Sequence, residues 1–444
     1  MKKIFIVFFG LGVANMLSAQ EELGVHLLRD AWQANRTNPA ILPNQKIVIG
    51  LPGVYNNLLL TNITYADLAV KNDNGEEIID VNNAIPLLKN SGNLVRENLD
   101  IETLSAAVRL GKISVSLGHV LRFGAFINYP KTLPQLIWQG NAQFIGQNVD
   151  FSTDMQLNGY HEWYAGLAVS PIEGLTIGAR AKYLSGIADV STERKRLQLY
   201  TDSVAYALSL DADLLANSAG VLEYESIRNL SFNFDFGKLE TEHLFSQNNG
   251  YAFDFGVYYQ GKRWDVAASV LDLGGKIEWK ENVKNYSISG VTEFKGLDVA
   301  QQLLNDSTEI GPVLDTLEQL YEPVETQNSY STKLAPRYYL SASYNINDTW
   351  RVGAMYYTET LRGEPFPAFA LSAHVKLLKI VQLGVLYAYR NKSFDNVGAN
   401  VLVKLGPLQV LAATDNLLTV FQPEKSHSVN ARLGLSLLLG KSQP

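Results

Sequence analysis

The sequence predicts an all-β chain that closes into a transmembrane antiparallel β-barrel of about 14 to 18 strands with an N-terminal hatch or plug segment. Three observations predict it: apolar and polar residues alternate over long stretches, aromatic residues gather at the ends of those stretches, and short connections alternate with long ones. A β protein of the periplasm or cell surface is the alternative, because its strands would also alternate.

The alternation is clearest between Tyr251 and Gly275. Tyr251, Phe253 and Phe255 fall on one side of an extended chain, and Asp254 and Gly256 fall on the other. Successive side chains of a strand point to opposite faces, so this stretch predicts a β-hairpin with one apolar face. Many of the predicted strands have about 9 to 12 residues, which suits a tilted strand that crosses a bilayer. The same pattern recurs at 163–183, 338–356, 369–389, 397–405 and 429–439.

Aromatic residues and turns define the two ends of the predicted barrel. Trp264 and Trp350 begin predicted strands, as expected for the aromatic girdles of outer-membrane barrels. Such barrels have short periplasmic turns and longer external loops. A consistent strand count requires residues 276–280 to form a short strand of their own. The predicted short turns are 170–174, 260–263, 346–349, 377–379 and 405–407, and the longer loops are 186–196, 296–333 and 415–427.

Residues 1–19 have the features of a secretory signal peptide, with Lys2 and Lys3 before an apolar run and cleavage expected after Ala19. The chain has no cysteine, which excludes disulfides, a lipoprotein anchor and thiolate metal sites. Acidic residues outnumber basic ones, 44 to 37, so a nucleic-acid partner is not expected. We therefore expect a protein of the outer membrane of a Gram-negative bacterium, with membrane lipid as its surroundings.

Two further parts follow the signal peptide. Residues 20–100 are predicted to be the hatch or plug segment, with room for a first strand, because their apolar spacing is closer to helical and prolines and charges interrupt it. Residues 101–440 are predicted to form the barrel, with 296–333 as a long external loop that carries helical elements. Residues 130–146 predict a short helix at the barrel mouth.

One segment of the predicted hatch resembles a known family. Asn35–Asn44, which contains Asn38, Pro39 and Ala40, resembles the Asn-Pro-Ala segment that opens the FadL-type long-chain fatty acid transporters and their PorV relatives. Several predicted strands resemble those of Bacteroidota outer-membrane barrels in that superfamily, within an uncharacterised branch. The resemblance implies a barrel of about 14 strands closed by a hatch. It implies either passage of hydrophobic molecules, as in the transporters, or a role in protein secretion, as in the PorV relatives.

Cationic residues recur on the polar side of the predicted strands and should point into the lumen. One interpretation is an electropositive channel that attracts an anionic ligand, because narrow clefts concentrate the electrostatic field. The other is a ladder of interior salt bridges with Asp254, Asp265 and Glu359. The candidate lumen residues are Arg180, Lys182, Arg351, His374, Lys376, Arg390 and Arg432, with Arg263 and Lys404 on the same pattern.

The sequence gives few signs of enzymatic chemistry. It lacks the serine-hydrolase elbow, the phosphate-binding loop and the His-Glu-x-x-His zinc motif, so no catalytic residue, metal or cofactor is predicted. His161 and Glu162 near Asp154 are the one cluster that suggests a hydrolase, and a polar strand end is the much stronger explanation for them. Three hypotheses remain: a passive barrel for hydrophobic or amphipathic small molecules, a barrel that binds proteins during secretion or surface assembly, and an outer-membrane hydrolase.

Overall fold

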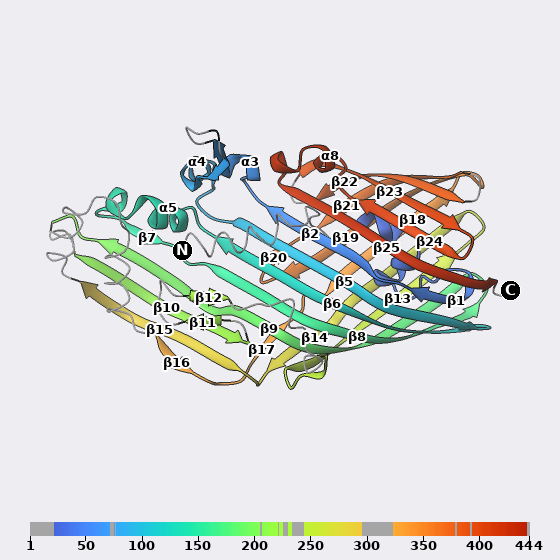
Figure 1. Ribbon diagram of the computed structural model, residues 1–444, viewed down its shortest axis with the longest axis horizontal. Coiled ribbons are helices and arrows are strands. Elements are labelled where there is room, and N and C mark those ends of the chain that lie inside the picture. Colours follow the sequence, from blue (N-terminus) through green and yellow to red (C-terminus); the bar gives the residue numbers. More distant parts are fainter. Residues whose placement is uncertain are drawn as a thin grey trace.

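The computed structural model describes residues 22–71, 75, 77–204, 207–220, 222–224, 230–232, 244–294, 323–377, 380–390 and 393–441. Fourteen antiparallel strands close a barrel, and β1 and β2 together form one of these fourteen because they follow each other between β25 and β5 (Figure 1). No helix among these residues is long and apolar enough to cross a membrane. The predicted signal peptide lies outside the described residues. In order around the wall, the strands are β1 (Gln45–Gly50) with β2 (Gly53–Leu60), β5 (Asn93–Leu110), β6 (Ile113–Tyr129), β8 (Asp154–Ile172), β9 (Leu175–Thr201), β13 (Asn249–Gln260), β14 (Trp264–Trp279), β18 (Arg337–Asn345), β19 (Trp350–Leu361), β21 (Ala368–Leu377), β22 (Val381–Arg390), β23 (Ser393–Leu405), β24 (Leu408–Thr414) and β25 (Ser428–Lys441).

The barrel closes because its last strand pairs with its first. Strand β25 pairs with β24 on one side and with both β1 and β2 on the other, and β1 and β2 pair in turn with β5. Leu51 and Pro52 interrupt the shared strand, and the Leu51 amide still donates to the Leu435 carbonyl at 3.0 Å. Closure satisfies the backbone groups of the wall without water, as a strand in contact with lipid requires.

The wall begins at Gln45, well before the expected boundary at residue 101. The segment predicted as a hatch at 20–100 is therefore divided: residues 22–44 lie inside the barrel, 45–60 belong to its wall, and β5 already starts at Asn93. Charged residues on the inner face of β5, including Arg96, Asp100 and Glu102, break the apolar alternation by which the other strands were recognised.

The two ends of the barrel differ as the alternation of turns predicts, except that the loop predicted at 186–196 is part of β9. The five predicted short turns all lie at one end, between β8 and β9, β13 and β14, β18 and β19, β21 and β22, and β23 and β24. Most of the predicted loop at 296–333 lies outside the described residues. The connections at the other end hold α3 (Tyr65–Leu68), β3 (Ala69–Lys71), β4 (Glu77–Ile79), α4 (Val81–Ala84), η2 (Ile85–Leu87), α5 (Thr132–Gln139), η3 (Ala142–Phe144), β11 (Leu222–Tyr224), β12 (Leu230–Phe232), β20 (Glu364–Pro365), α8 (Leu418–Phe421) and η6 (Pro423–Lys425).

Part of the sheet continues beyond the closed wall at the long-loop end (Figure 1). The distal part of β9 pairs with β10, and β10 pairs with β15 over its whole length. Residues 276–280 do not form a separate strand, since β14 runs on to Trp279; Gly274 and Gly275 lie at a register irregularity inside β14. This extension comprises β7 (Asn148–Asp150), β10 (Leu208–Ala219), β15 (Val283–Phe294), β16 (Val324–Thr326) and β17 (Tyr330–Lys333).

The outer face of the wall is apolar and the inner face is polar. On β13, Phe253 and Phe255 are 48% and 47% exposed, whereas Asp254 between them is fully buried. Trp264 and Trp350 are also exposed on the outer face, close to the short turns. An apolar outer band next to aromatic side chains is the surface that a barrel presents to lipid.

Candidate functional site in the lumen

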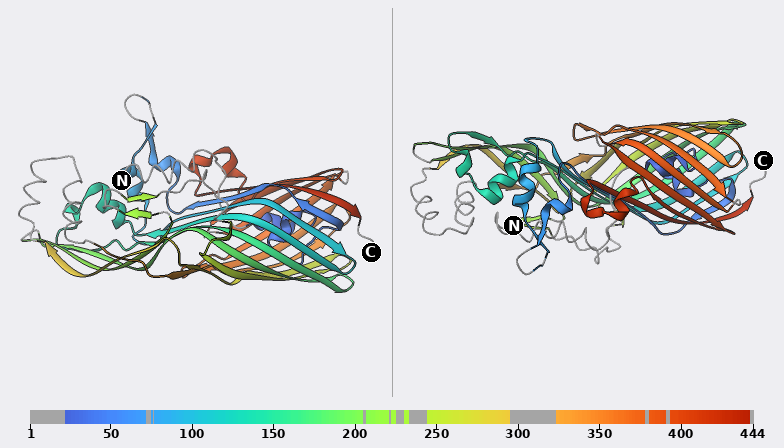
Figure 2. Two further views of the ribbon diagram at one scale, coloured as in Figure 1. Left: turned by 60° about the horizontal axis from the view of Figure 1, so that its bottom comes forward. Right: turned by 90° about the horizontal axis from the view of Figure 1, so that it is seen from above.

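Residues 22–44, hereafter the hatch, lie inside the half of the barrel next to the short turns, as Figure 2 shows. The hatch contains one turn of helix, α2 (Leu23–Leu27), and a 3-10 turn, η1 (Trp32–Arg36), and nearly all of its side chains are buried. Its two short turns lack side-chain caps from within the segment. The wall therefore has to supply the partners for its polar groups.

Residues 35–40, hereafter the anchor, attach the hatch to β9, β13 and β14. Asn38 Nδ2 donates to the carbonyls of Val257 and Ala268 at 3.2 and 3.1 Å, and Asn38 Oδ1 accepts from the Ala40 amide at 2.9 Å. Ser269 Oγ donates to the Thr37 carbonyl at 2.7 Å. Asn38, Pro39 and Ala40, picked out by resemblance, thus form the part of the hatch that follows the wall most closely.

Two wall glycines make room for the anchor. A Cβ atom at Gly256 would lie 2.0 Å from Asn38 Oδ1, and one at Gly178 would lie 2.5 Å from the carbonyl carbon of Pro39. Both distances are shorter than a nonbonded contact allows, and Gly178 faces backbone that has little freedom to move. Glycine at these positions of β9 and β13 therefore permits the close approach.

A buried charge cluster surrounds Arg36 of the hatch. Glu162 lies at its centre, 3.0 Å from Arg36, 3.1 Å from Arg122 and 3.6 Å from Lys182. Cations and carboxylates are equal in number, so the cluster is electrically balanced. Removing one member of such a network leaves a buried charge without compensation. The cations are Arg36, Arg122, Arg180, Lys182, Arg337 and Arg432, and the carboxylates are Glu22, Asp100, Glu102, Glu162, Asp254 and Asp272.

Helix α2 contacts the opposite half of the wall. Asp415, in the loop after β24, accepts from the Leu23 and Gly24 amides at 3.1 and 2.9 Å. Burial raises the pKa of the Asp415 carboxyl, although Arg390 at 3.2 Å acts in the opposite direction. His26 contributes two hydrogen bonds, one with Thr37 inside the hatch at 2.8 Å and one with Ser341 of β18 at 2.9 Å.

The structure pairs the predicted lumen cations with carboxylates. Arg180, Lys182 and Arg432 belong to the charge cluster. On the other half of the wall, Arg351 pairs with Asp265, Lys376 with Asp30 of the hatch, and Arg390 with Asp415, while His374 is buried on β21 beside Arg351. Arg263 is exposed at the β13–β14 turn and Lys404 is half-buried on β23. These pairs form the predicted ladder of salt bridges, and a role in ligand binding stays a prediction.

The cluster that suggested a hydrolase is not assembled. Glu162 lies in the charge cluster, whereas His161 is hydrogen-bonded to His119 at 2.9 Å. Asp154 pairs with Lys195 at 2.8 Å and also with Arg362. Within the described residues, no group of three or more His, Asp or Glu side chains is arranged to hold a metal ion.

Sequence reasoning missed more than half of the charge cluster. Arg122, Asp100 and Glu102 lie on the inner faces of β5 and β6, which were not recognised as strands. The period-two spacing of Asp100 and Glu102 was the signal that could have placed them on one face. Arg36 was also missed, because nothing in the sequence shows which wall residues the hatch meets.

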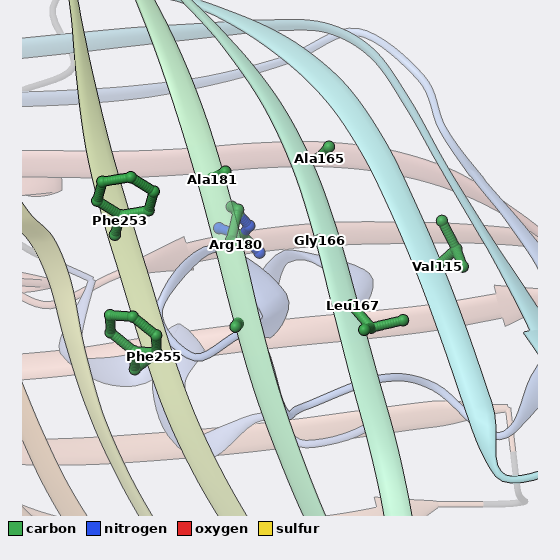
Figure 3. Close-up of a pocket in the computed structure, with 9 residues that line it drawn as sticks. Val115, Ala165, Gly166, Leu167, Arg180, Ala181, Phe253 and Phe255 are labelled. Carbon is green, nitrogen blue, oxygen red and sulfur yellow. The ribbon is translucent and has the colours of Figure 1, made fainter.

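A shallow groove of about 320 Å³ lies on the outer face of β6, β8, β9 and β13 (Figure 3). Ala165, Ala179 and Ala181 form its floor, between the larger side chains of Leu167 and Phe253. Ala165 and Ala181 are direct partners in the β8–β9 pairing, so the hollow spans two strands. The groove opens away from the lumen and is therefore separate from the hatch.

Comparisons with known proteins place the chain in a family and beside solved barrels. A model described as "Family of unknown function (DUF5723)" matches residues 39–415. No curated protein matches the chain. The toluene transporter TbuX of Ralstonia pickettii is similar at 10% identity over 92% of this chain and 94% of that chain, with a TM-score of 0.44. The toluene transporter TodX of Pseudomonas putida has 10% identity over 95% of this chain and 98% of that chain, with a TM-score of 0.41. A Pseudomonas aeruginosa FadL homologue has 11% identity over 92% of this chain and 93% of that chain, with a TM-score of 0.38. At these values the likeness carries no argument about what this chain binds.

Proposed function

The chain belongs to DUF5723, a family of unknown function, and we propose that it is an outer-membrane barrel through which hydrophobic or amphipathic small molecules pass or in which they bind, controlled by the hatch. The apolar outer face with its aromatic residues supports a place in the membrane. The short turns face the periplasm and the sheet extension faces outward, the usual orientation of such barrels. An N-terminal signal peptide, cleaved after Ala19, directs the chain there.

One observation carries this proposal: a separate segment lies in the lumen, and polar contacts with the wall hold much of it. The hatch joins the wall covalently only where it runs into β1 at Gln45. Its contacts with the wall include hydrogen bonds of Asn38 and His26 and ion pairs of Arg36 and Asp30. Water or a polar ligand can replace the neutral hydrogen bonds at small net cost, whereas the buried ion pairs of Arg36 and the apolar contacts of Leu23 and Leu27 resist release. We therefore propose that a part of the hatch moves while the barrel stays folded.

The predicted lumen residues divide between two roles in this proposal. Arg180 and Lys182 hold the charge cluster together beside the anchor, and Arg432 extends it to Glu22. Arg351, His374 and Lys376 line the half of the lumen that α2 faces, where a passing molecule would meet them. Arg390 acts through Asp415, which receives the first amides of α2.

A disulfide lock tests whether the hatch controls passage. A Cβ at Gly434 of β25 would lie 3.0 Å from Gln33 Cγ, so the pair Gln33→Cys and Gly434→Cys is close to the Cβ separation of about 3.8 Å that a disulfide needs. The chain contains no cysteine, so no other disulfide competes. Uptake of a fluorescent long-chain fatty acid into proteoliposomes should stop in the oxidised protein and return on reduction.

The control for the lock is a disulfide within the wall. Ala342 and Ala354 are direct partners on β18 and β19, and a cysteine pair there leaves the hatch free. Oxidation of this pair should leave uptake unchanged. Equal uptake by the oxidised and reduced hatch-lock protein would contradict hatch control.

A protein-binding role is the second candidate, and the sheet extension favours it. Strands β10 and β15 continue the wall beyond the closed barrel, a surface that passage of a small molecule does not require. Cross-linking of intact cells, followed by purification of the barrel, should then return one partner at a fixed ratio. Recovery of the barrel with lipid alone would count against this role.

A further inference from the structure

Six residues form a polar seam on the inner wall opposite α2. Ser343 of β18, Gly353 of β19 and Ser372 of β21 are aligned in register, and His374 of β21, Gly384 of β22 and Asn400 of β23 form a second aligned row. Each row places a glycine between two polar residues. We call these six residues the seam.

The polar side chains of the seam are buried without hydrogen-bond partners. Ser343 Oγ, Ser372 Oγ, His374 Nε2 and Asn400 Oδ1 each lack one within the described part of the chain. A buried polar atom left unpaired costs about 1 to 3 kcal/mol, so four of them in two adjacent rows call for a polar partner. By contrast, Asn38 and Ser269 at the anchor are paired with backbone carbonyls.

Gly353 of the seam forms a cradle for such a partner. A Cβ at Gly353 would lie 2.9 Å from Ser343 Oγ and 3.1 Å from Ser372 Oγ, the distances at which a ligand oxygen would bond to both hydroxyls. At Gly384, by contrast, a Cβ would lie 2.3 Å from both His374 Cδ2 and Asn400 Oδ1, so the neighbouring side chains already fill this position. The two hydroxyls and the imidazole can donate, which suits an acceptor such as a carboxylate, whereas Asn400 Oδ1 accepts and needs a donor such as water.

An apolar patch adjoins the seam on the same strands. Met355 of β19, Ala370 of β21 and Leu386 of β22 belong to one buried cluster with Leu23 and Leu27 of α2. Leu27 Cδ2 lies 3.3 Å from the Gly353 cradle. Helix α2 therefore covers both the patch and one end of the seam.

The charges around the seam favour an anion. Arg351 is the cross-strand partner of His374, Lys376 follows it on β21, and Arg29 donates to Ser341 at 2.7 Å. Asp265 and Asp30 pair with two of these three cations. Lys404 also acts on Asp30, so cations outnumber carboxylates around the seam, and an anion would balance part of this excess.

We propose that the seam and the patch together bind a monoanionic amphiphile, and that α2 occupies the apolar part of this site until the ligand displaces it. The headgroup oxygens bond to the seam, and the tail replaces Leu23 and Leu27 on the patch. Binding thereby releases α2 while the anchor stays in place. This inference rests on the proposed passage of amphipathic molecules and names the half of the lumen that receives them.

Binding of decanoate to the intact barrel in lipid nanodiscs tests this site. Calorimetry, after subtraction of partitioning into protein-free discs, should show saturable decanoate binding that is tighter than that of decanol or decyltrimethylammonium. The double variant Ser343→Ala, Ser372→Ala should bind decanoate about tenfold or more weakly, because each hydroxyl would donate to a charged group. Ser116→Ala, a buried serine on the opposite half of the wall, is the matched control and should bind as the wild type does.

Leu27→Ala separates displacement of α2 from a purely structural role of the seam. Removing the side chain that competes with the tail should tighten decanoate binding, whereas a structural defect would weaken it. Equal affinity in all variants, or no saturable binding by the wild type, would overturn the inference. If the wild type fails to bind and the Gln33–Gly434 lock still stops uptake, the proposed function stands; if the lock also has no effect, both fall.

Discussion

The anchor and α2 belong to the same short hatch, yet they meet the wall in different ways. At the anchor, Asn38 and Thr37 are bonded to the wall, and glycines bring backbone against backbone. At α2, Asp415 and Ser341 bond to the helix, but the wall beside them presents Ser343, Ser372 and Asn400, which carry polar atoms without partners among the described residues. The difference indicates that the hatch is fixed at one side and releasable at the other.

The largest expected effect compares locks on the two sides. The pair Asn38→Cys and Gly256→Cys should form a disulfide, because a Cβ at Gly256 would lie 2.9 Å from Asn38 Cγ. This lock only replaces contacts that stay in place, so fatty acid uptake by the oxidised protein should stay within about twofold of uptake by the reduced protein. Oxidation of the Gln33–Gly434 lock should instead abolish uptake. Loss of uptake with both locks would show that the whole hatch has to leave.

A large loss of stability is expected at the centre of the charge cluster. Glu162→Gln removes a carboxylate that contacts Arg36, Arg122 and Lys182, and such a change in a buried network costs about 3 to 5 kcal/mol. Urea unfolding in detergent, followed by the gel shift between folded and unfolded barrel, measures it. Glu278→Gln at an exposed ion pair is the control and should leave stability almost unchanged, because solvent screens this pair. Equal losses would contradict the central place of Glu162.

The sequence alone predicted the barrel better than the lumen. Long apolar alternation at 251–275 identified outward faces such as Phe253 and Phe255, because lipid demands the same chemistry at every outward position. Inner faces obey no such rule. The charges of Asp100 and Glu102 prevented recognition of β5 as a strand. The partner of Arg36 depends on where the hatch docks, and no local sequence pattern specifies a contact between residues so far apart in the chain.

A smaller effect compares one polar side chain from each side of the hatch. Asn38→Ala leaves two backbone carbonyls without a donor and should lower the free energy of unfolding by about 1 to 3 kcal/mol. Ser343→Ala removes a hydroxyl without a partner and should leave the free energy unchanged or raise it slightly. Urea titration of both variants measures the difference. An equal loss in both would remove the contrast between anchor and seam.

The smallest effect concerns the ion pair between Lys376 and Asp30. The lysine side chain is 46% exposed, so Lys376→Met should cost no more than about 1 kcal/mol in the same unfolding assay. Decanoate binding should weaken more clearly, because the variant removes one positive charge beside the seam and leaves the negative charge of Asp30 without this partner. Unchanged decanoate affinity would contradict the role of charge at this site.

Hydrogen exchange of the hatch amides tests most directly whether one side is fixed and the other releasable. Mass spectrometry of the barrel in nanodiscs, with and without decanoate, can follow peptides that cover 23–30 and 35–41 separately. The account predicts that decanoate speeds exchange at 23–30 and leaves 35–41 protected. Faster exchange in both segments together, or in neither, would contradict it.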